Sequence, residues 1–419
     1  MSYFRIYIYL KIKYFFLSVF YRNNLSSSKF DILFKKFTKK NKTLFVGQLR
    51  VGFYLVLKYL KKKFPEKREI ILNSYNLAEM VNICKNLNLK LIFVKLNKNI
   101  YLSAEDVEKK INRNTLAVVG TNIFNTFEDI RNIKTICKKK KIPFIEDNAI
   151  YFGNFTGKNK QKYYAGSFGD YSLHSFNIMK SLSAMYGGSV STNDKQFINF
   201  ARHEILTFKK FPLIKYLKQC IIYFILKLLS INFFYKALFL KIIKKAHEND
   251  NKFILSLIYP SLKFKKKKLS NNFCTKISEL SKTMVKLQLN NINNINLNHS
   301  IKKSNNIYYD KLFNRLKISN LRIINLKDSN FQNFNDYPII VTNKKKLVMY
   351  LLDQDIETKA IQYVDCQKIF NNQNKMKLYE YQDKILCLPN HSKITKKYID
   401  LIVYKIYNFY KKNQFNKLI

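Results

Sequence analysis

Short apolar runs alternate with helical stretches between about residues 45 and 194, and this alternation limits the possible fold more than any other feature. A βαβα order with continuous apolar strands is typical of a largely parallel α/β sheet that helices cover on both faces. Helices are expected at 47–60, 78–87, 104–112 and 127–140. The runs expected to form strands are EIILNS (69–74), LKLIFVKL (89–96), TLAVVGTNI (115–123), IPFIEDNA (142–149), DYSLHSF (170–176) and GGSVSTN (187–193).

Glycine is confined to the same part of the chain. All nine glycines lie between Gly47 and Gly188. Glycine allows a positive φ and a close approach of the backbone to a ligand. The turns that need these properties are therefore expected in the first half of the chain. Ligands of parallel sheets bind at the carboxyl ends of the strands, which places Asp147, at the end of PFIED, near an expected site.

The formal net charge of +49 raises the question of nucleic-acid binding, because clustered Lys and Arg bind phosphates. Here the basic residues are spread over nearly the whole chain together with an excess of Asn and Ile, as expected of a general composition bias. We therefore expect no nucleic-acid partner. A positive surface still attracts anionic partners such as phosphorylated sugars and acidic lipid headgroups.

The cysteines are widely scattered, and they form neither a CxxC pair nor a regular framework. This usage favours a reduced, cytoplasmic protein, and it gives little support to a metal site. The apolar and basic N-terminal segment lacks a small-residue cleavage site, so a secretory signal is disfavoured.

The chain is expected to divide into four parts. An N-terminal arm (1–44) precedes a large domain (45–204), an apolar helical insertion (205–268) and a smaller α+β C-terminal domain (269–419), in which DYPIIVT (336–342) is an expected strand. Its centre, CIIYFILKLLSINFFYKALFLKII (220–243), approaches the length of a membrane span, but Lys227, Lys236 and Lys241 interrupt it, and charges in mid-span are costly. An ordinary buried helical pair and a contact with a membrane interface both remain open for it.

Lys180 is the only lysine among residues 174–193, inside a chain where lysine is common. A lysine amine becomes a useful nucleophile toward aldehydes when burial lowers its pKa, and Schiff-base chemistry with pyridoxal phosphate is a frequent use. That cofactor also needs a carboxylate beside its ring nitrogen, and Asp147 has the right place in the chain. A partly exposed loop lysine and a helix-capping Asp remain the alternative explanation of the spacing.

Two further features suit a phosphate. Gly47 opens a helix whose N-terminal amides favour anions. Ser175, just before Phe176, offers a hydroxyl. Each feature alone is ordinary.

The order of the motifs in 142–194 resembles the DegT/DnrJ/StrS family of PLP-dependent sugar aminotransferases. The elements that match are Glu146-Asp147, Gly153, Ser167-Phe168-Gly169-Asp170, Ser175-Phe176 to Lys180, Gly187-Gly188 and Thr192-Asn193-Asp194. Weaker similarity extends over roughly 45–204 and 270–410.

The resemblance implies a PLP-dependent transferase of fold type I, with a mostly parallel seven-stranded sheet in the large domain and active sites at a homodimer interface. It implies that Lys180 is the catalytic Schiff-base lysine and that Asp147 pairs with the pyridine nitrogen of pyridoxal 5'-phosphate. It further implies that Ser175 and the Gly47–Gln48 turn hold the phosphate and that position 150 lies beside the cofactor.

The implied reaction is transfer of an amino group from an amino-acid donor, with glutamate expected, to a nucleotide-linked keto-sugar in amino-sugar and surface-polysaccharide biosynthesis. The expected location is the cytoplasm, with a peripheral contact to the inner face of the membrane through 205–268.

The sequence departs from the family at several of these positions. Ile150 stands where the family usually has Gln or His, and Gln48 stands where it commonly has Thr or Arg. In NNFCTKISEL (271–280), Lys276 takes the place of the family's Arg, and the Asn is out of register. A binding or regulatory protein with the same fold is therefore the alternative. The related sugar dehydratases replace the lysine with His, so Lys180 argues against that activity.

Overall fold

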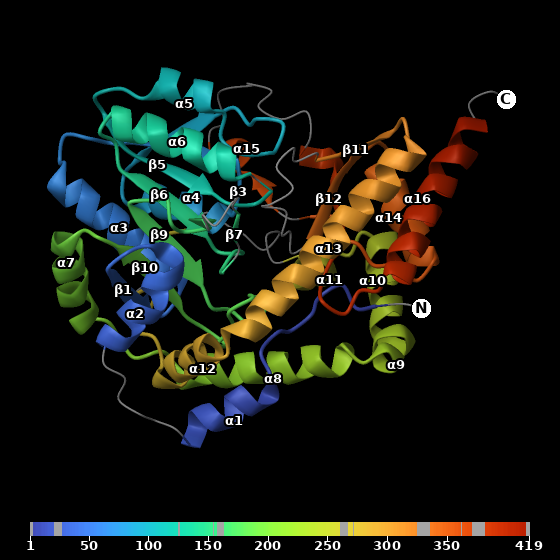
Figure 1. The fold of residues 1–419 in the computed structure, drawn as a ribbon, viewed down its shortest axis with the longest axis horizontal. Coiled ribbons are helices and arrows are strands. Elements are labelled where there is room, and N and C mark those ends of the chain that lie inside the picture. Colours follow the sequence, from blue (N-terminus) through green and yellow to red (C-terminus); the bar gives the residue numbers. More distant parts are fainter. Residues whose placement is uncertain are drawn as a thin grey trace.

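The large domain is built on a mostly parallel seven-stranded sheet with the order β1-β10-β9-β6-β5-β2-β4 (Figure 1). Its strands are β1 (Lys42–Val46), β2 (Glu69–Asn73), β4 (Lys90–Val94), β5 (Thr115–Thr121), β6 (Phe144–Asn148), β9 (Tyr171–Ser175) and β10 (Gly188–Thr192). Neighbours among β4, β2, β5, β6 and β9 pair in parallel, whereas β10 is antiparallel to both β9 and β1. The sequence analysis predicted six of these strands and missed β1.

The computed structural model describes most of the 419 residues. These are residues 3–20, 27–124, 126–153, 155–156, 163–259, 267–270, 272–324, 336–361, 363–370 and 382–415. Parts of the N-terminal arm, of the insertion and of the segment 271–280 lie outside the described residues.

Helices cover both faces of the sheet, as the continuous apolar strands predicted. On one face α3 (Leu49–Lys63), α4 (Ala78–Asn86) and α7 (Lys195–Leu206) bury their apolar sides, and on the other α5 (Ala104–Lys110) and α6 (Phe127–Lys139) do so. The start of α6 is fixed by a capping box, in which the Thr126 hydroxyl accepts from the Asp129 amide and the Asp129 carboxylate accepts from the Thr126 amide.

The chain between residues 213 and 258 is mostly helical. It contains α8 (Leu213–Leu229), α9 (Asn232–Phe234), a π-helical segment η1 (Tyr235–Phe239), α10 (Leu240–Glu248) and α11 (Lys252–Ile258). Figure 1 shows α8 lying along the lower edge of the molecule, beside α12 (Glu279–Asn290). Within the described parts of the chain, no helix has the length and apolar character needed to cross a membrane.

The small domain packs helices against a three-stranded antiparallel sheet with the order β11-β12-β14. Its elements are the long connecting helix α13 (Ile292–Leu316), β11 (Leu321–Ile323), β12 (Asp336–Val341), α14 (Lys344–Asp353), η4 (Gln382–Lys384), β14 (Ile385–Pro389) and α16 (Lys396–Phe415). The short helix α15 (Cys366–Phe370) packs instead against α4. Short two-stranded ladders pair β3 (Tyr75–Asn76) with β13 (Val364–Asp365), which ties the two domains together, and β7 (Phe155–Thr156) with β8 (Tyr163–Tyr164).

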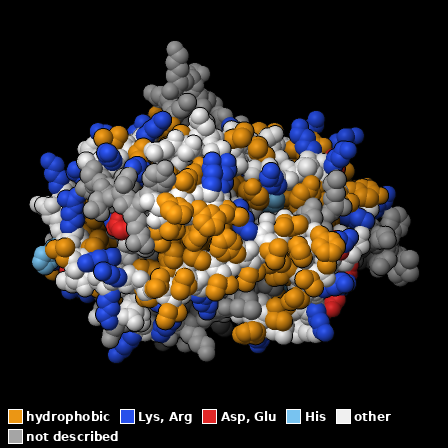
Figure 2. Space-filling model, turned by 90° about the horizontal axis from the view of Figure 1, so that it is seen from below, with side chains coloured by type: hydrophobic (Ala, Val, Ile, Leu, Met, Phe, Trp, Pro, Cys, Tyr) orange, Lys and Arg blue, Asp and Glu red, His pale blue; other side chains and the backbone are white. Residues whose placement is uncertain are grey.

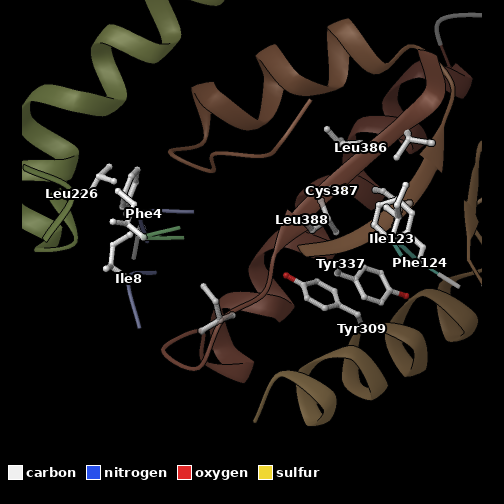
Figure 3. Close-up of a cluster of buried hydrophobic side chains, with 14 of the residues drawn as sticks. Phe4, Ile8, Ile123, Phe124, Leu226, Tyr309, Tyr337, Leu386, Cys387 and Leu388 are labelled. Atoms are coloured by element: carbon white, nitrogen blue, oxygen red, sulfur yellow. The ribbon is translucent and has the colours of Figure 1, made fainter. Parts of the chain in front are cut away.

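The N-terminal arm is part of the core. Besides α1 (Ile12–Phe20) and α2 (Ser27–Thr38), its extended residues bury Phe4 and Ile8 in a cluster with α8 and the small domain (Figure 3). The Arg5 guanidinium donates to the Glu357 carboxylate at 3.2 Å, and both side chains are almost fully buried. The Tyr235 hydroxyl of the insertion donates to the same carboxylate at 3.0 Å. Arm, insertion and small domain therefore meet at one buried charge.

Two glycines bring the backbone of β10 against the start of α3. A Cβ on Gly188 would lie 2.3 Å from the Leu49 amide nitrogen, a contact with backbone that cannot move aside. A Cβ on Gly52, within α3, would instead meet the Val190 side chain at 2.6 Å.

We expect Gly188→Ala to lower the free energy of unfolding by roughly 1–3 kcal/mol, because overpacking against backbone forces local shifts. Gly52→Ala is the matched control. Its clash is with a side chain, and alanine gains about 1 kcal/mol of helix propensity over glycine. Urea unfolding of both variants measures the difference, and a Gly188→Ala variant as stable as Gly52→Ala would contradict this close approach.

Candidate functional site

Asp147 lies at the carboxyl edge of the parallel strands. It is buried near the end of β6, in register with Thr121 of β5 and Leu173 of β9. Its Oδ1 accepts a hydrogen bond from the Ala149 amide at 3.0 Å. Burial raises the pKa of this carboxyl to about 6, while that amide and the Lys180 amine act in the opposite direction.

The neighbouring residue Glu146 holds the backbone around the site. Its carboxylate accepts from the amides of Gly166, Phe168 and Gly169 at 2.7, 3.0 and 2.8 Å, and from the Asn122 side chain at 3.0 Å. Successive residues of a strand point to opposite faces. Glu146 and Asp147 therefore have different roles. Glu146 holds the loop before β9, and the Asp147 side chain lies on the opposite face of the strand.

Lys180 lies in the turn between β9 and β10. The turn is closed by the Phe176 amide, which donates to the Gly187 carbonyl at 3.0 Å, and by the Ala184 amide, which donates to the Phe176 carbonyl at 2.7 Å. Burial lowers the pKa of the Lys180 amine to about 8, and the Lys359 cation lowers it further. Asp147 acts to raise it, so the structure brings the two predicted groups into electrostatic contact.

Lys359 was not expected at this site. Lys180 is isolated from other lysines in the sequence, but in the structure the Lys359 cation lies within electrostatic range of it. Lys359 comes from the small domain, where its ammonium pairs with Asp336 at 3.2 Å and its backbone bonds to Cys387. A second cation near Lys180 favours the uncharged amine. With a pKa of about 8, about a tenth of Lys180 is uncharged at pH 7, against about one part in several thousand for an ordinary lysine.

The predicted phosphate turn and Ser175 lie next to each other. Ser175, partly exposed at the end of β9, is in register with Gly188, and Gln48 bridges to Gly187. Gln48 precedes the first turn of α3 in an extended conformation, and its Oε1 accepts from Arg50 at 2.8 Å. The sheet register therefore places the Ser175 backbone beside the start of α3.

Thr275 is a residue that the sequence analysis missed. The Gly47 amide donates to the Thr275 carbonyl at 2.9 Å, and a Cβ on Gly47 would lie 2.1 Å from the Thr275 hydroxyl. This buried hydroxyl has no hydrogen-bond partner among the described residues. Its neighbour Lys276, which the sequence analysis named as the departure from the family's Arg, is partly exposed.

Ile150 follows β6 and is partly buried. It packs against the apolar cluster of α5 and α6 and against that of the small domain. It offers only apolar contact at the position predicted to border the cofactor.

These residues fit pyridoxal phosphate. Lys180 provides an amine of low pKa, Asp147 a buried carboxylate for a protonated ring nitrogen, and the unpartnered Thr275 hydroxyl lies against the helix start where a phosphate would bind. The described residues contain no group of three or more His, Cys, Asp or Glu side chains that could hold a metal ion.

We expect two substitutions to move the pKa of Lys180 in opposite directions. Lys359→Met removes a neighbouring cation, so the pKa should rise above about 8, whereas Asp147→Asn removes the stabilising anion and should lower it. Competitive acetylation of the unliganded protein across pH, with the Lys180 peptide quantified by mass spectrometry, measures both. A Lys180 pKa that stays the same in both variants, or that moves in the same direction in both, would contradict the electrostatic contacts.

Known proteins resemble this chain in part of its sequence and in nearly all of its fold. Residues 18–211 match the DegT/DnrJ/EryC1/StrS aminotransferase family. The GDP-perosamine synthase of Vibrio cholerae is 28% identical over 172 residues, 41% of this chain and 45% of that protein. The GDP-perosamine synthase of Escherichia coli O157:H7 is 31% identical over 170 residues, 40% of this chain and 46% of that protein. The matched part thus spans less than half the length of these relatives.

Solved structures share the fold at low sequence identity. Helicobacter pylori PseC, an aminotransferase involved in the biosynthesis of pseudoaminic acid, superposes with a TM-score of 0.71 at 15% identity, covering 98% of this chain and all of that one. The aminotransferase TlmJ from Streptoalloteichus hindustanus gives 0.66 at 14% identity, covering 96% of this chain and 98% of that one. The fold is shared with these solved aminotransferases, and residues 18–211, less than half of the chain, match the DegT/DnrJ/EryC1/StrS aminotransferase family.

Proposed function

We propose that the protein is a PLP-dependent aminotransferase that transfers an amino group from an amino-acid donor, glutamate in the first instance, to a nucleotide-linked keto-sugar. The observation that carries the proposal is the pairing of the partly exposed Lys180 with the buried Asp147 beside a helix start suited to phosphate. When bound, pyridoxal phosphate supplies an aldehyde that takes up the amino group and a ring that stores an electron pair.

The chain's own residues have separate roles in this proposal. Lys180 is the nucleophile that holds the cofactor and, once released, the base that moves a proton between donor carbon and cofactor. Asp147 keeps the ring nitrogen protonated, and its burial strengthens that ion pair. Ser175, Gly47, Gln48 and Thr275 hold the phosphate, and Ile150 excludes water from the ring.

The substrate class comes from the relatives. GDP-perosamine synthase names a GDP-linked sugar, and another relative, 24% identical over 131 residues, is a Helicobacter pylori transaminase named for a UDP-linked 4-amino sugar. A sugar amine made by transamination comes from a ketone at the same carbon, so we propose a nucleotide-linked keto-sugar and a role in amino-sugar and surface-polysaccharide synthesis.

The proposal includes a homodimer whose subunits complete each other's sites, and a cytoplasmic location with a peripheral contact to the inner face of the membrane. Sedimentation equilibrium tests the dimer, and a monomer at all concentrations would remove that part. The alternative is a binding or regulatory protein with the same fold, which the apolar Ile150 favours. It predicts that the protein binds pyridoxal phosphate but that amino acids leave the cofactor spectrum unchanged.

We expect the purified protein to bind pyridoxal phosphate covalently, with an absorbance band that borohydride fixes on the Lys180 peptide. Lys180→Ala should lose the band and lower the rate of amino transfer by roughly 10²–10⁴-fold, because it removes the proton carrier. The exposed Lys138→Ala on α6 is the matched control.

Two results would contradict the function. One is a wild-type protein that ignores added cofactor. The other is a cofactor-loaded protein whose spectrum no amino acid changes and which aminates none of a panel of GDP- and UDP-linked keto-sugars.

A further inference from the structure

The arm and the insertion expose an apolar surface that the proposed reaction does not use. Figure 2 shows this face, on which hydrophobic side chains gather where α1 and α8 lie at the lower edge of Figure 1. We call it the α1/α8 face and define it by its most exposed members in those helices. These are Phe16 and Phe20 of α1 and Leu213, Ile214, Leu217 and Ile221 of α8, each 51–82% exposed.

The two helices form one continuous surface. The rings of Phe15 and Phe224 meet edge to face with centroids 5.9 Å apart. The Tyr223 hydroxyl donates to the Leu10 carbonyl at 3.0 Å, and the Lys227 ammonium donates to the Ile8 carbonyl at 2.8 Å. Tyr223 and Lys227 of α8 thus point inward to the arm, whereas Lys215 and Lys218 stay exposed beside the outward apolar side chains.

Both sides of α8 are apolar. Its buried side contains Tyr216, Cys220, Tyr223 and Leu226 besides Gln219, and most of its isoleucines and leucines face solvent. A surface helix of a soluble protein normally buries its apolar stripe. Contiguous exposed apolar surface of this kind marks a site of interaction with a protein or a membrane.

The charges around the face identify the partner. Residues 205–247 contain nine lysines and no acidic residue, and residues 3–20 contain no acidic residue either. Lys13, Lys215, Lys218 and Lys241 are exposed, and none of them forms an ion pair within the described part of the chain. An apolar surface set among unpaired cations complements a bilayer with anionic headgroups.

A second copy of the chain is a poorer partner for the same surface. A self-association through this face would bring lysines of two subunits together with no acidic residue in either segment to pair them. Like charges across an interface are repulsive. Anionic lipid complements both the lysines and the apolar side chains of this face, because its phosphates lie at the level of the ammonium groups and its acyl chains lie below them.

We propose that the α1/α8 face docks on the surface of an anionic membrane, with α8 lying in the plane of the interface. Gln219, on the buried side of α8, donates to Asn177 at 3.3 Å, three residues before Lys180. The membrane-facing helix is therefore a direct neighbour of the turn that bears the reactive lysine. The proposal rests on the surface and does not depend on the reaction.

Flotation of the full chain with vesicles tests the proposal. We expect binding to vesicles that contain phosphatidylserine or phosphatidylglycerol, weak binding to pure phosphatidylcholine, and release by salt. Lys215→Gln/Lys218→Gln should weaken binding by roughly tenfold or more. Ile214→Gln/Leu217→Gln/Ile221→Gln should abolish stable binding. These side chains are exposed, so circular dichroism and thermal unfolding should match the wild type.

Matched controls use the same changes elsewhere. Ile32→Gln/Leu297→Gln alters exposed apolar residues of α2 and α13, and Lys138→Gln/Lys139→Gln removes exposed cations of α6. Both should bind like the wild type. Equal loss in the controls, no binding of the wild type to anionic vesicles at low salt, or equal binding to neutral vesicles would overturn the proposal. So would a wild-type dimer that the triple apolar variant converts to monomer.

Discussion

The site depends on a partly exposed lysine whose amine lies within the field of one buried carboxylate. Burial disfavours charge on both groups, so the pKa of Lys180 falls and that of Asp147 rises, while their mutual attraction limits both shifts. This balance needs fixed positions. Asp147 is fixed by the register of β5, β6 and β9, and Lys180 by a turn whose two ends hydrogen-bond to each other.

The strands and helices of the large domain were predictable because buried parallel strands are apolar throughout and the helices between them carry clear end signals. The strand β1 was missed because KTLFV follows a lysine-rich helix with no distinct turn signal between them. Its place is set by antiparallel pairing with β10, from Val46–Gly188, 142 residues apart, to Lys42–Thr192, 150 residues apart. The glycines beside this strand, Gly47 directly after β1 and Gly187–Gly188 at the start of β10, were by contrast predicted as turn residues from the sequence.

The predicted site residues were identified from the order of motifs along the chain. Such motifs contain only residues that lie close together in the sequence. Lys359 and Thr275 reach the site from the small domain and from the start of the segment before α12. Neither has a local pattern that distinguishes it from the many other lysines and polar residues of this composition. Lys359 in particular could not be predicted, because no sequence pattern distinguishes one functional lysine from the many others in this chain.

The shared carboxylate of Glu357 has a consequence for the chain's first residues. Ends of domains usually fray and tolerate trimming, but here Arg5 neutralises a buried anion that lies two residues from Lys359. Removing the first ten residues would leave the Glu357 carboxylate buried without the Arg5 cation. The free energy of unfolding would fall by about 3–5 kcal/mol. The first residues of the chain thus stabilise the interior of the small domain. A shortened chain would lose buried interactions there as well as contacts at the surface.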